Sequence, residues 1–256
     1  MGEAVLSAML SRKLAKPLDI TVSDISAARR KYLEQQYGVT ATEDNRLATE
    51  KGNIVVLAIK PQNLAEVMAG LSGHLKPAQL ALSIIAGVRL STLCQGLQHD
   101  RIVRAMPNTP AQISSGITVW TTTKEVTESQ KKWAGSILGA TGKEIYFDDE
   151  KYIDMATAVS GSGPAYFFLF VESLVESAVS IGLPRDIAEE LVLQTMLGSA
   201  HLIQKSGKQP AELRRMVTSP GGTTAEAMLH FEKGGFSNLV REAVRAAYEK
   251  AQKLGK

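Results

Sequence analysis

The apolar and polar positions of the first 147 residues follow two alternating periods. Short continuous apolar runs rich in β-branched residues, typical of buried strands, are separated by segments whose apolar residues recur at helical spacing. The predicted strands cover residues 18–22, 53–59, 80–85, 101–104, 118–122 and 143–147, and the predicted helices cover residues 3–14, 26–36, 62–71 and 128–138. Strands that alternate with helices in this way predict a doubly wound parallel sheet.

Beyond residue 147 the strand pattern stops and only helical spacing remains. A predicted helix over residues 164–181 is apolar on more than one face, from Phe167 to Val175, and such a helix must be buried on most sides. The helical part cannot supply that cover alone, so we expect a partner subunit. We therefore predict two domains, residues 1–147 and residues 148–256. The other predicted helices cover residues 148–159, 184–205, 210–217, 224–233 and 236–254.

The composition narrows the possible function classes. Lys and Arg total 29 against 26 Asp and Glu, and this net charge of +3 is spread along the chain, which gives no support for nucleic-acid binding. The single cysteine, Cys94, has no partner for an internal disulfide, and the 4 histidines lack the spacing of a metal site. The sequence has no run of 18 apolar residues and no signal peptide, so we expect a soluble cytoplasmic protein without a membrane span.

Unusual residues follow four of the predicted strands at their carboxyl ends. These segments are Ser23–Asp24, Ala58–Pro61, Ile84–Gly87 and Met106–Pro110. Ligands of a doubly wound sheet bind at the carboxyl ends of its strands. Each segment alone is typical of an ordinary turn, but together they predict a crevice for a nucleotide.

Two loops rich in Gly, Ser and Thr precede helices in the second half, at residues 159–164 and 218–224. A helix start presents unpaired N–H groups and the positive end of the helix dipole, so either loop could bind a carboxylate or a phosphate. Ordinary helix capping explains the same residues equally well. No histidine lies near a nucleophile in the sequence, which favours a chemistry without a strong protein base, such as hydride transfer from a nicotinamide cofactor.

Six motifs occur in order along the chain: LAIKP at 57–61, SIIAGV at 83–88, RAMPNTP at 104–110, VSGSGPAY at 159–166, GLPRDIA at 182–188 and MVTSPGGTTAEA at 216–227. They resemble the motifs of the pyrroline-5-carboxylate reductase family, and the last is the most specific. The resemblance implies reduction of L-1-pyrroline-5-carboxylate to L-proline with NADPH or NADH, the last step of proline biosynthesis. It also implies a Rossmann domain followed by an all-helical dimerisation domain, in a homodimer or a higher oligomer of dimers.

The N-terminus departs from the family pattern. The family begins with a strand and a G-x-G-x-M-G turn, whereas Met1-Gly2 matches only the last two residues of that turn. The first strand and the two glycines that face the cofactor pyrophosphate are therefore missing from this sequence, which leaves the start of the first helix to bind the pyrophosphate. We expect either that Met1 is not the natural start or that this copy is impaired.

The other cofactor positions match the family. The resemblance implies that Ser23 and Asn45 lie at the adenosine end, and that residues 58–61 and 84–86 line the ribose and nicotinamide. An acid at Asp24 would favour NAD(H), whereas Ser23, Arg29 and Arg30 would favour the 2′-phosphate of NADP(H), and the sequence leaves this choice open. The complete expected cofactor set is Met1, Gly2, Ser23, Asn45, Ala58, Ile59, Lys60, Pro61, Ile84, Ile85, Ala86 and Asn108.

The resemblance places a proline-like substrate at the second Gly/Ser/Thr loop. Its carboxylate would accept hydrogen bonds from the helix start at Gly222, Thr223 and Thr224 and from the Ser219 hydroxyl. Thr224, the expected catalytic residue, would place its hydroxyl near the imine nitrogen. Glu150 is a further candidate for the same pocket, although an acid in the first turn of a helix is equally ordinary.

Two other functions compete with this one. A β-hydroxyacid dehydrogenase would combine a Rossmann domain with helices, but no Asn-x-x-x-Lys pair follows Gly161. A non-catalytic binding protein would explain a genuinely missing first strand.

Overall fold

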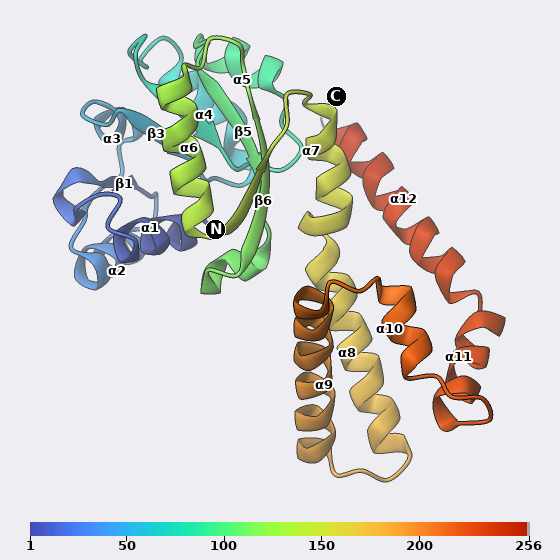
Figure 1. The fold of residues 1–256 in the computed structure, drawn as a ribbon. Coiled ribbons are helices and arrows are strands. Elements are labelled where there is room, and N and C mark those ends of the chain that lie inside the picture. Colours follow the sequence, from blue (N-terminus) through green and yellow to red (C-terminus); the bar gives the residue numbers. More distant parts are fainter. Residues whose placement is uncertain (255–256) are drawn as a thin grey trace. The chain divides into compact units, whose positions relative to one another are not determined.

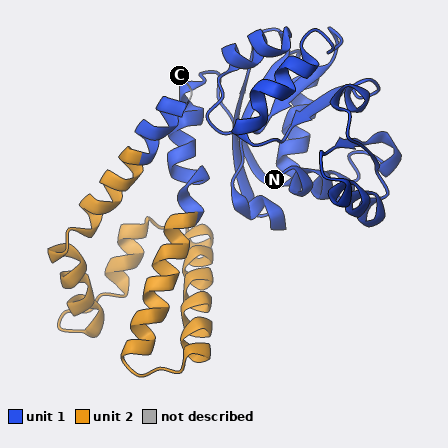
Figure 2. Ribbon diagram, turned by 180° about the vertical axis from the view of Figure 1, so that it is seen from behind, with its two compact units in different colours: residues 1–164, 247–256 blue, residues 165–246 orange. Residues whose placement is uncertain are grey.

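The computed structural model describes residues 1–254 as two compact units (Figures 1 and 2). Unit 1 contains Met1–Pro164 and the residues from Ala247 onward, and unit 2 contains Ala165–Ala246. The division falls later than the predicted boundary at residue 147, because helix α7 (Lys151–Ala156) packs on strands of unit 1.

The strands of unit 1 form two separate sheets. β1 and β2 pair with each other, and the remaining strands form a five-stranded sheet in the order β3-β4-β5-β6-β7. The predicted parallel sheet is confirmed for every neighbouring pair of this sheet except β5 and β6, which are antiparallel. A parallel connection needs a long crossover, whereas residues 107–115 hold only a short 3₁₀ helix. The strands are β1 (Thr21–Ser23), β2 (Thr40–Thr42), β3 (Ile54–Leu57), β4 (Leu80–Ser83), β5 (Ile102–Met106), β6 (Gly116–Thr122) and β7 (Gly142–Tyr146).

Helix α1 (Gly2–Ser11) packs on both sheets. Val5 belongs to the core cluster of the five-stranded sheet, whereas Leu6 packs with Val22 of β1. In the usual order of a doubly wound sheet, the first strand lies between the strands that correspond here to β1 and β3. Among the described strands, β1 and β3 do not pair with each other. α1 connects the two sheets by packing on both, and α3 also contacts β1 and α4.

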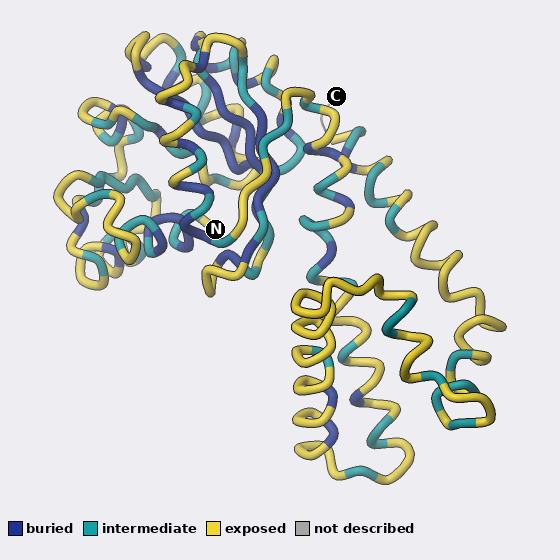
Figure 3. Tube along the Cα trace, viewed as in Figure 1, coloured by how far each residue is buried: buried dark blue, intermediate teal, exposed yellow. Residues whose placement is uncertain are grey.

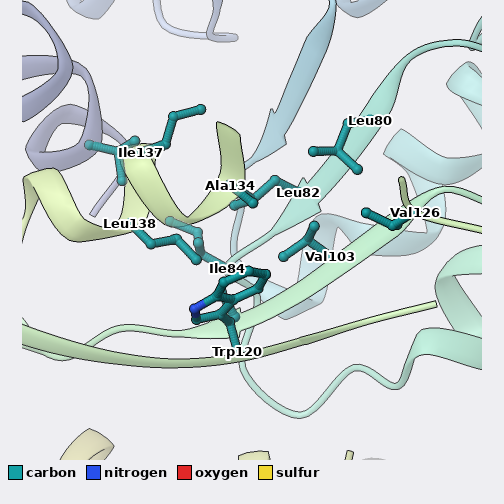
Figure 4. Packing of buried hydrophobic residues seen from close by; sticks show 11 residues of the cluster. Leu80, Leu82, Ile84, Val103, Trp120, Val126, Ala134, Ile137 and Leu138 are labelled. Atoms are coloured by element: carbon teal, nitrogen blue, oxygen red, sulfur yellow. The ribbon is translucent and has the colours of Figure 1, made fainter. Parts of the chain in front are cut away.

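Both faces of the five-stranded sheet are covered by helices. β4 is the most deeply buried strand, with Leu80, Ala81 and Leu82 at 0% exposure, as its continuous apolar run predicts (Figure 3). α1 and α6 (Glu128–Ala140) cover one face, where Figure 4 shows Trp120 among aliphatic side chains of β4, β5 and α6. α4 (Leu64–Leu71) and α5 (Leu90–Leu97) cover the other face. The remaining helices of this unit are α2 (Ala27–Tyr37) and α3 (Asn45–Thr49).

The structure differs from the sequence predictions at three places. The first predicted strand is only three residues long, because residues 17–19 form a 3₁₀ helix that leaves Leu18 85% exposed. β2 and α3 follow α2 without a predicted counterpart. The loop predicted at residues 159–164 is helical: a π-helix, Thr157–Gly161, joins α7 to α8 (Gly163–Ser180), and the Ser162 N–H donates to the Thr157 carbonyl. The π turn precedes Pro164, which has no N–H to donate.

Unit 2 consists of helices with a small core of their own. Val175 of α8 packs against Ala188 and Val192 of α9 (Arg185–Ser206). The rest of the apolar surface of α8 is open, and Phe167, Phe168 and Leu169 are 60–63% exposed. The sequence prediction that this unit cannot cover its own apolar side chains is therefore confirmed. The remaining helices are α10 (Pro210–Met216), α11 (Thr223–Lys233) and α12 (Phe236–Leu254), whose last residues return to unit 1.

Candidate functional site

Three of the four predicted strand ends meet at one edge of unit 1. β3, β4 and β5 are adjacent and parallel, so residues 58–61, 84–86 and 107–108 follow them at the same edge of the sheet. Ile84 and Ile85 are buried, whereas Ala58 and Lys60 are exposed. Asn108 is half-buried, and its Oδ1 accepts a hydrogen bond of 2.9 Å from the Ile117 N–H. This contact fixes the loop after β5.

The start of α1 lies against the same edge. A Cβ atom added to Gly2 would lie 3.0 Å from the Ala58 Cβ, so a larger residue would be crowded where the helix approaches the segment after β3. Met1 is the N-cap residue and makes no side-chain capping bond. The first amides of α1 are therefore left for another acceptor, and a helix start beside this edge suits a pyrophosphate.

The residues expected at the adenosine end belong to the smaller sheet and the segments around it. Ser23 ends β1 and Asn45 begins α3, and both are half-buried. The Asp24 Oδ1 accepts a hydrogen bond of 2.8 Å from the Ser26 N–H, and Arg30 donates to the Asp24 carbonyl at 2.8 Å. The acid and the arginine are thus both engaged in shaping the turn after β1.

Glu3 makes contacts with α2 that the sequence pattern does not predict. Its carboxylate, in the first turn of α1, forms an ion pair with Arg29 and accepts hydrogen bonds from Tyr32 at 3.1 Å and Tyr37 at 2.8 Å. The hydrogen bond from Arg29 holds the pKa of Glu3 below its ordinary value, and the same pair raises the pKa of Arg29. This cluster anchors α1 to α2, beside the proposed pyrophosphate site.

The second predicted loop folds into a tight turn at the start of α11. The Gly222 N–H donates to the Ser219 carbonyl at 3.1 Å, Pro220 lies between them, and Gly221 has φ of +70°, as in a type II turn. A Cβ atom on Gly222 would lie 2.7 Å from the Ser219 Oγ. Only glycine permits this close approach, so the turn delivers the Ser219 hydroxyl directly beside the helix start.

The N-cap residue of α11 is Gly222, which has no side chain to cap the helix. The first amides of α11, together with the hydroxyls of Thr223 and Thr224, are therefore groups that could bind an anion. An open pocket of about 430 Å³ also lies against the turn, but Glu226 and Glu232 are in its wall. Two carboxylates would repel an anionic ligand, so the helix start is the better anion site.

Glu150 lies in unit 1, immediately before α7. Its Oε1 accepts hydrogen bonds of 2.8 Å from the Leu90 N–H and from Arg104 Nη1. Arg104 Nη2 donates to Asp154 Oδ1, also at 2.8 Å. Arg104 is 2% exposed, and the sequence pattern does not distinguish it from an arginine at a strand end. A charge inside a buried strand, followed by two acids one helical turn apart, is the signal that could have revealed this cluster.

Comparison with known proteins gives consistent results for both halves of the chain. Residues 150–254 match the family described as pyrroline-5-carboxylate reductase dimerisation, and residues 1–87 match the family described as NADP oxidoreductase coenzyme F420-dependent. A pyrroline-5-carboxylate reductase of Synechocystis sp. is 43% identical over 256 residues, which cover 100% of this chain and 95% of that protein.

Two solved structures resemble the whole chain. A pyrroline-5-carboxylate reductase from Coxiella burnetii is 34% identical with a TM-score of 0.89. A pyrroline carboxylate reductase from Plasmodium falciparum, solved with NADP bound, is 31% identical with a TM-score of 0.91. In both comparisons the match covers 100% of this chain and 95% of the other.

Proposed function

The chain belongs to the pyrroline-5-carboxylate reductase family, and from this membership we propose that it reduces L-1-pyrroline-5-carboxylate to L-proline with NADPH. The observation that carries the proposal is the turn before α11. It joins an uncapped helix start to the Ser219 hydroxyl and to Thr224, in the motif that most specifically resembles the family. An anionic substrate with a reactive nitrogen next to its carboxylate suits such a site.

In the proposed site, different groups of the protein bind the carboxylate and the imine nitrogen of the substrate. The carboxylate accepts hydrogen bonds from the N–H groups of Thr223 and Thr224 and from the Ser219 hydroxyl, next to Gly222, whose own N–H closes the turn. The Thr224 hydroxyl orients the imine nitrogen, whose proton comes from solvent or arrives on the substrate. The imine carbon accepts a hydride, the carbon–nitrogen double bond becomes a single bond, and proline leaves. The family resemblance also makes Glu150 a candidate for binding the substrate, and its Oε2 atom accepts neither of the hydrogen bonds described above.

The cofactor that supplies the hydride is NADP(H), in keeping with the family matches and with the relative solved with NADP bound. The close packing of Gly2 on Ala58 and the uncapped start of α1 fit a pyrophosphate. We propose that Ser23 and Asn45 bind the adenosine end and that the strand ends after β3, β4 and β5 line the ribose and nicotinamide. Use of NAD(H) in addition is part of the same proposal.

The helical half contains a dimerisation domain, and we propose a homodimer, with higher oligomers built from dimers. The exposed apolar side chains of α8 support this assembly. Within residues 1–254, the helix Lys151–Ser180 is also long and apolar enough to cross a membrane, and 17% of its most apolar stretch is buried. One such helix is weak evidence for a membrane span. A subunit interface explains the same surface, so we propose a cytoplasmic enzyme. We keep residues 148–256 as the proposed dimerisation and substrate domain.

Steady-state kinetics of pyrroline-5-carboxylate-dependent NADPH oxidation test the proposal. Thr224→Val keeps the volume but removes the donor, and loss of a transition-state hydrogen bond should lower kcat/KM by roughly 100-fold. Thr224→Ser should retain most of the activity. Ser219→Ala should raise KM more than it lowers kcat, because a carboxylate contact is made equally in the ground and transition states.

The matched control is Thr218→Val. The Thr218 hydroxyl donates to the Arg214 carbonyl at 2.7 Å, at the end of α10, and takes no part in the proposed site. Its loss should leave kcat/KM within about twofold. Wild-type kcat/KM in Thr224→Val would show that the residue only begins its helix. No substrate-dependent oxidation by the wild-type chain would overturn the proposed reaction.

A further inference from the structure

The segment between β4 and α5 is held at both of its ends. At the first end, the Ile84 N–H donates to the Leu57 carbonyl of the neighbouring strand at 3.1 Å. At the other end, the Leu90 N–H donates to the Glu150 Oε1 at 2.8 Å. The first contact lies within the sheet, whereas the second comes from a residue 60 positions along the chain. The position of this segment therefore depends on Glu150.

Glu150 is itself fixed by a buried partner. Arg104 Nη1 donates to the same Oε1 at 2.8 Å, and the guanidinium is held in turn by Asp154. The Arg104 side chain is 2% exposed and the Asp154 side chain 11% exposed, so the pair is shielded from water and salt. Arg104 thus fixes Glu150, and Glu150 fixes the start of α5.

A second contact is made at the middle of the segment between β4 and α5. Gly87 has φ of +73°, and a Cβ atom there would lie 2.7 Å from the Leu254 Cβ. Leu254 ends α12, and Glu150 immediately precedes α7, which continues as one helix to Ser180. Both helices that connect the cofactor unit to the helical unit therefore contact the segment from Ile84 to Leu90.

We propose that Glu150 is a positioning residue for the nicotinamide end of the cofactor, acting through Leu90 on the segment that ends β4. This inference rests on the proposed function, which places Ile84–Ala86 at the nicotinamide. Arg104 holds the Glu150 carboxylate in place, and Leu254 limits movement of the segment at Gly87. The adenosine end lies on the smaller sheet and is independent of this connection.

The test compares two ligands on purified full-length protein. Glu150→Ala should weaken NADPH binding about tenfold, the loss expected for a charged hydrogen bond. The same variant should bind 2′-phospho-ADP-ribose, which lacks the nicotinamide, as the wild type does. Glu150→Gln keeps an acceptor for Leu90 and should restore most of the NADPH affinity. Asp149→Ala, which removes an adjacent exposed carboxylate paired with Lys151, is the control and should change neither affinity.

Fluorescence titration measures the affinity for each ligand, and circular dichroism checks that each variant is folded. Equal weakening of both ligands in Glu150→Ala, or unchanged NADPH binding, would overturn the positioning role. Unchanged NADPH binding together with a higher KM for pyrroline-5-carboxylate would show that Glu150 instead contacts the substrate. A wild-type chain that binds NADPH without reducing pyrroline-5-carboxylate would overturn the proposed function but leave this test valid. A wild-type chain that does not bind NADPH would overturn the positioning role as well.

Discussion

Replacing Arg104 by Met should destabilise the protein by about 3–4 kcal/mol. The guanidinium donates to Glu150 and Asp154, each at 2.8 Å, from a position that is 2% exposed. Methionine fills a similar volume, so little of the loss should come from a cavity. The main term is the Asp154 carboxylate, which is 11% exposed and would be left without its charged partner.

The magnitude follows from the burial of the two acids. Removal of one member of a buried ion pair costs roughly 3–5 kcal/mol, because the remaining charge is poorly solvated. The Glu150 side chain is 29% exposed and can regain water, so its contribution is small. Asp154 cannot regain water. Because only one of the two acids is left poorly solvated, we expect a loss in the lower half of this range. A single domain is usually stable by only about 5–15 kcal/mol, so the effect is large.

Urea unfolding at one fixed protein concentration measures the change by tryptophan fluorescence, to which the buried Trp120 and the exposed Trp133 both contribute. The midpoint should fall while the slope of the transition stays constant. The double variant Arg104→Met/Asp154→Leu removes both charges and should be more stable than Arg104→Met alone. A loss below about 1 kcal/mol, or a double variant less stable than the single one, would refute the assignment of stability to this ion pair.

Three further predictions concern other parts of the molecule. The pKa of Glu3 is lowered by Arg29, so this contact stabilises the fold above the ordinary carboxyl value of 4.5 and is lost as the pH falls through the lower folded value. The stability difference between wild type and Glu3→Gln should therefore shrink in urea unfolding below pH 4.5, and a constant difference would contradict this role. Leu193→Glu puts a charge on the 54% exposed Leu193 of α9 and should shift sedimentation at micromolar concentration towards the monomer, with Glu189→Ala as a control that stays dimeric. Adding an apolar strand and a Gly-x-Gly turn in front of Met1 should tighten NADPH binding, because β1 and β3 each have an edge without a partner strand among residues 1–254, and equal affinity in a fluorescence titration would oppose that role for the added strand.

The sequence by itself determined the elements whose signals are local. The helix predicted over residues 26–36 is α2, which has Ser26 as its cap and Gly38 in the left-handed conformation at its end. The continuous apolar run at Leu80 became the most buried strand of the sheet. Residues 219–222 contain a Pro-Gly-Gly turn because proline restricts φ and Gly221 accepts a positive φ. Each of these features depends on residues within a few positions of one another.

Only the tertiary structure decided how distant residues combine. Arg104 meets acids 46 and 50 positions along the chain, and no periodic pattern encodes that distance. The VSGSG segment at residues 159–163 looks like a loop by composition, yet the helices on either side continue through it. The antiparallel pairing of β5 and β6 follows from a connection too short for a crossover. Packing and chain connectivity settle such choices, because they bring together groups that local propensities cannot relate.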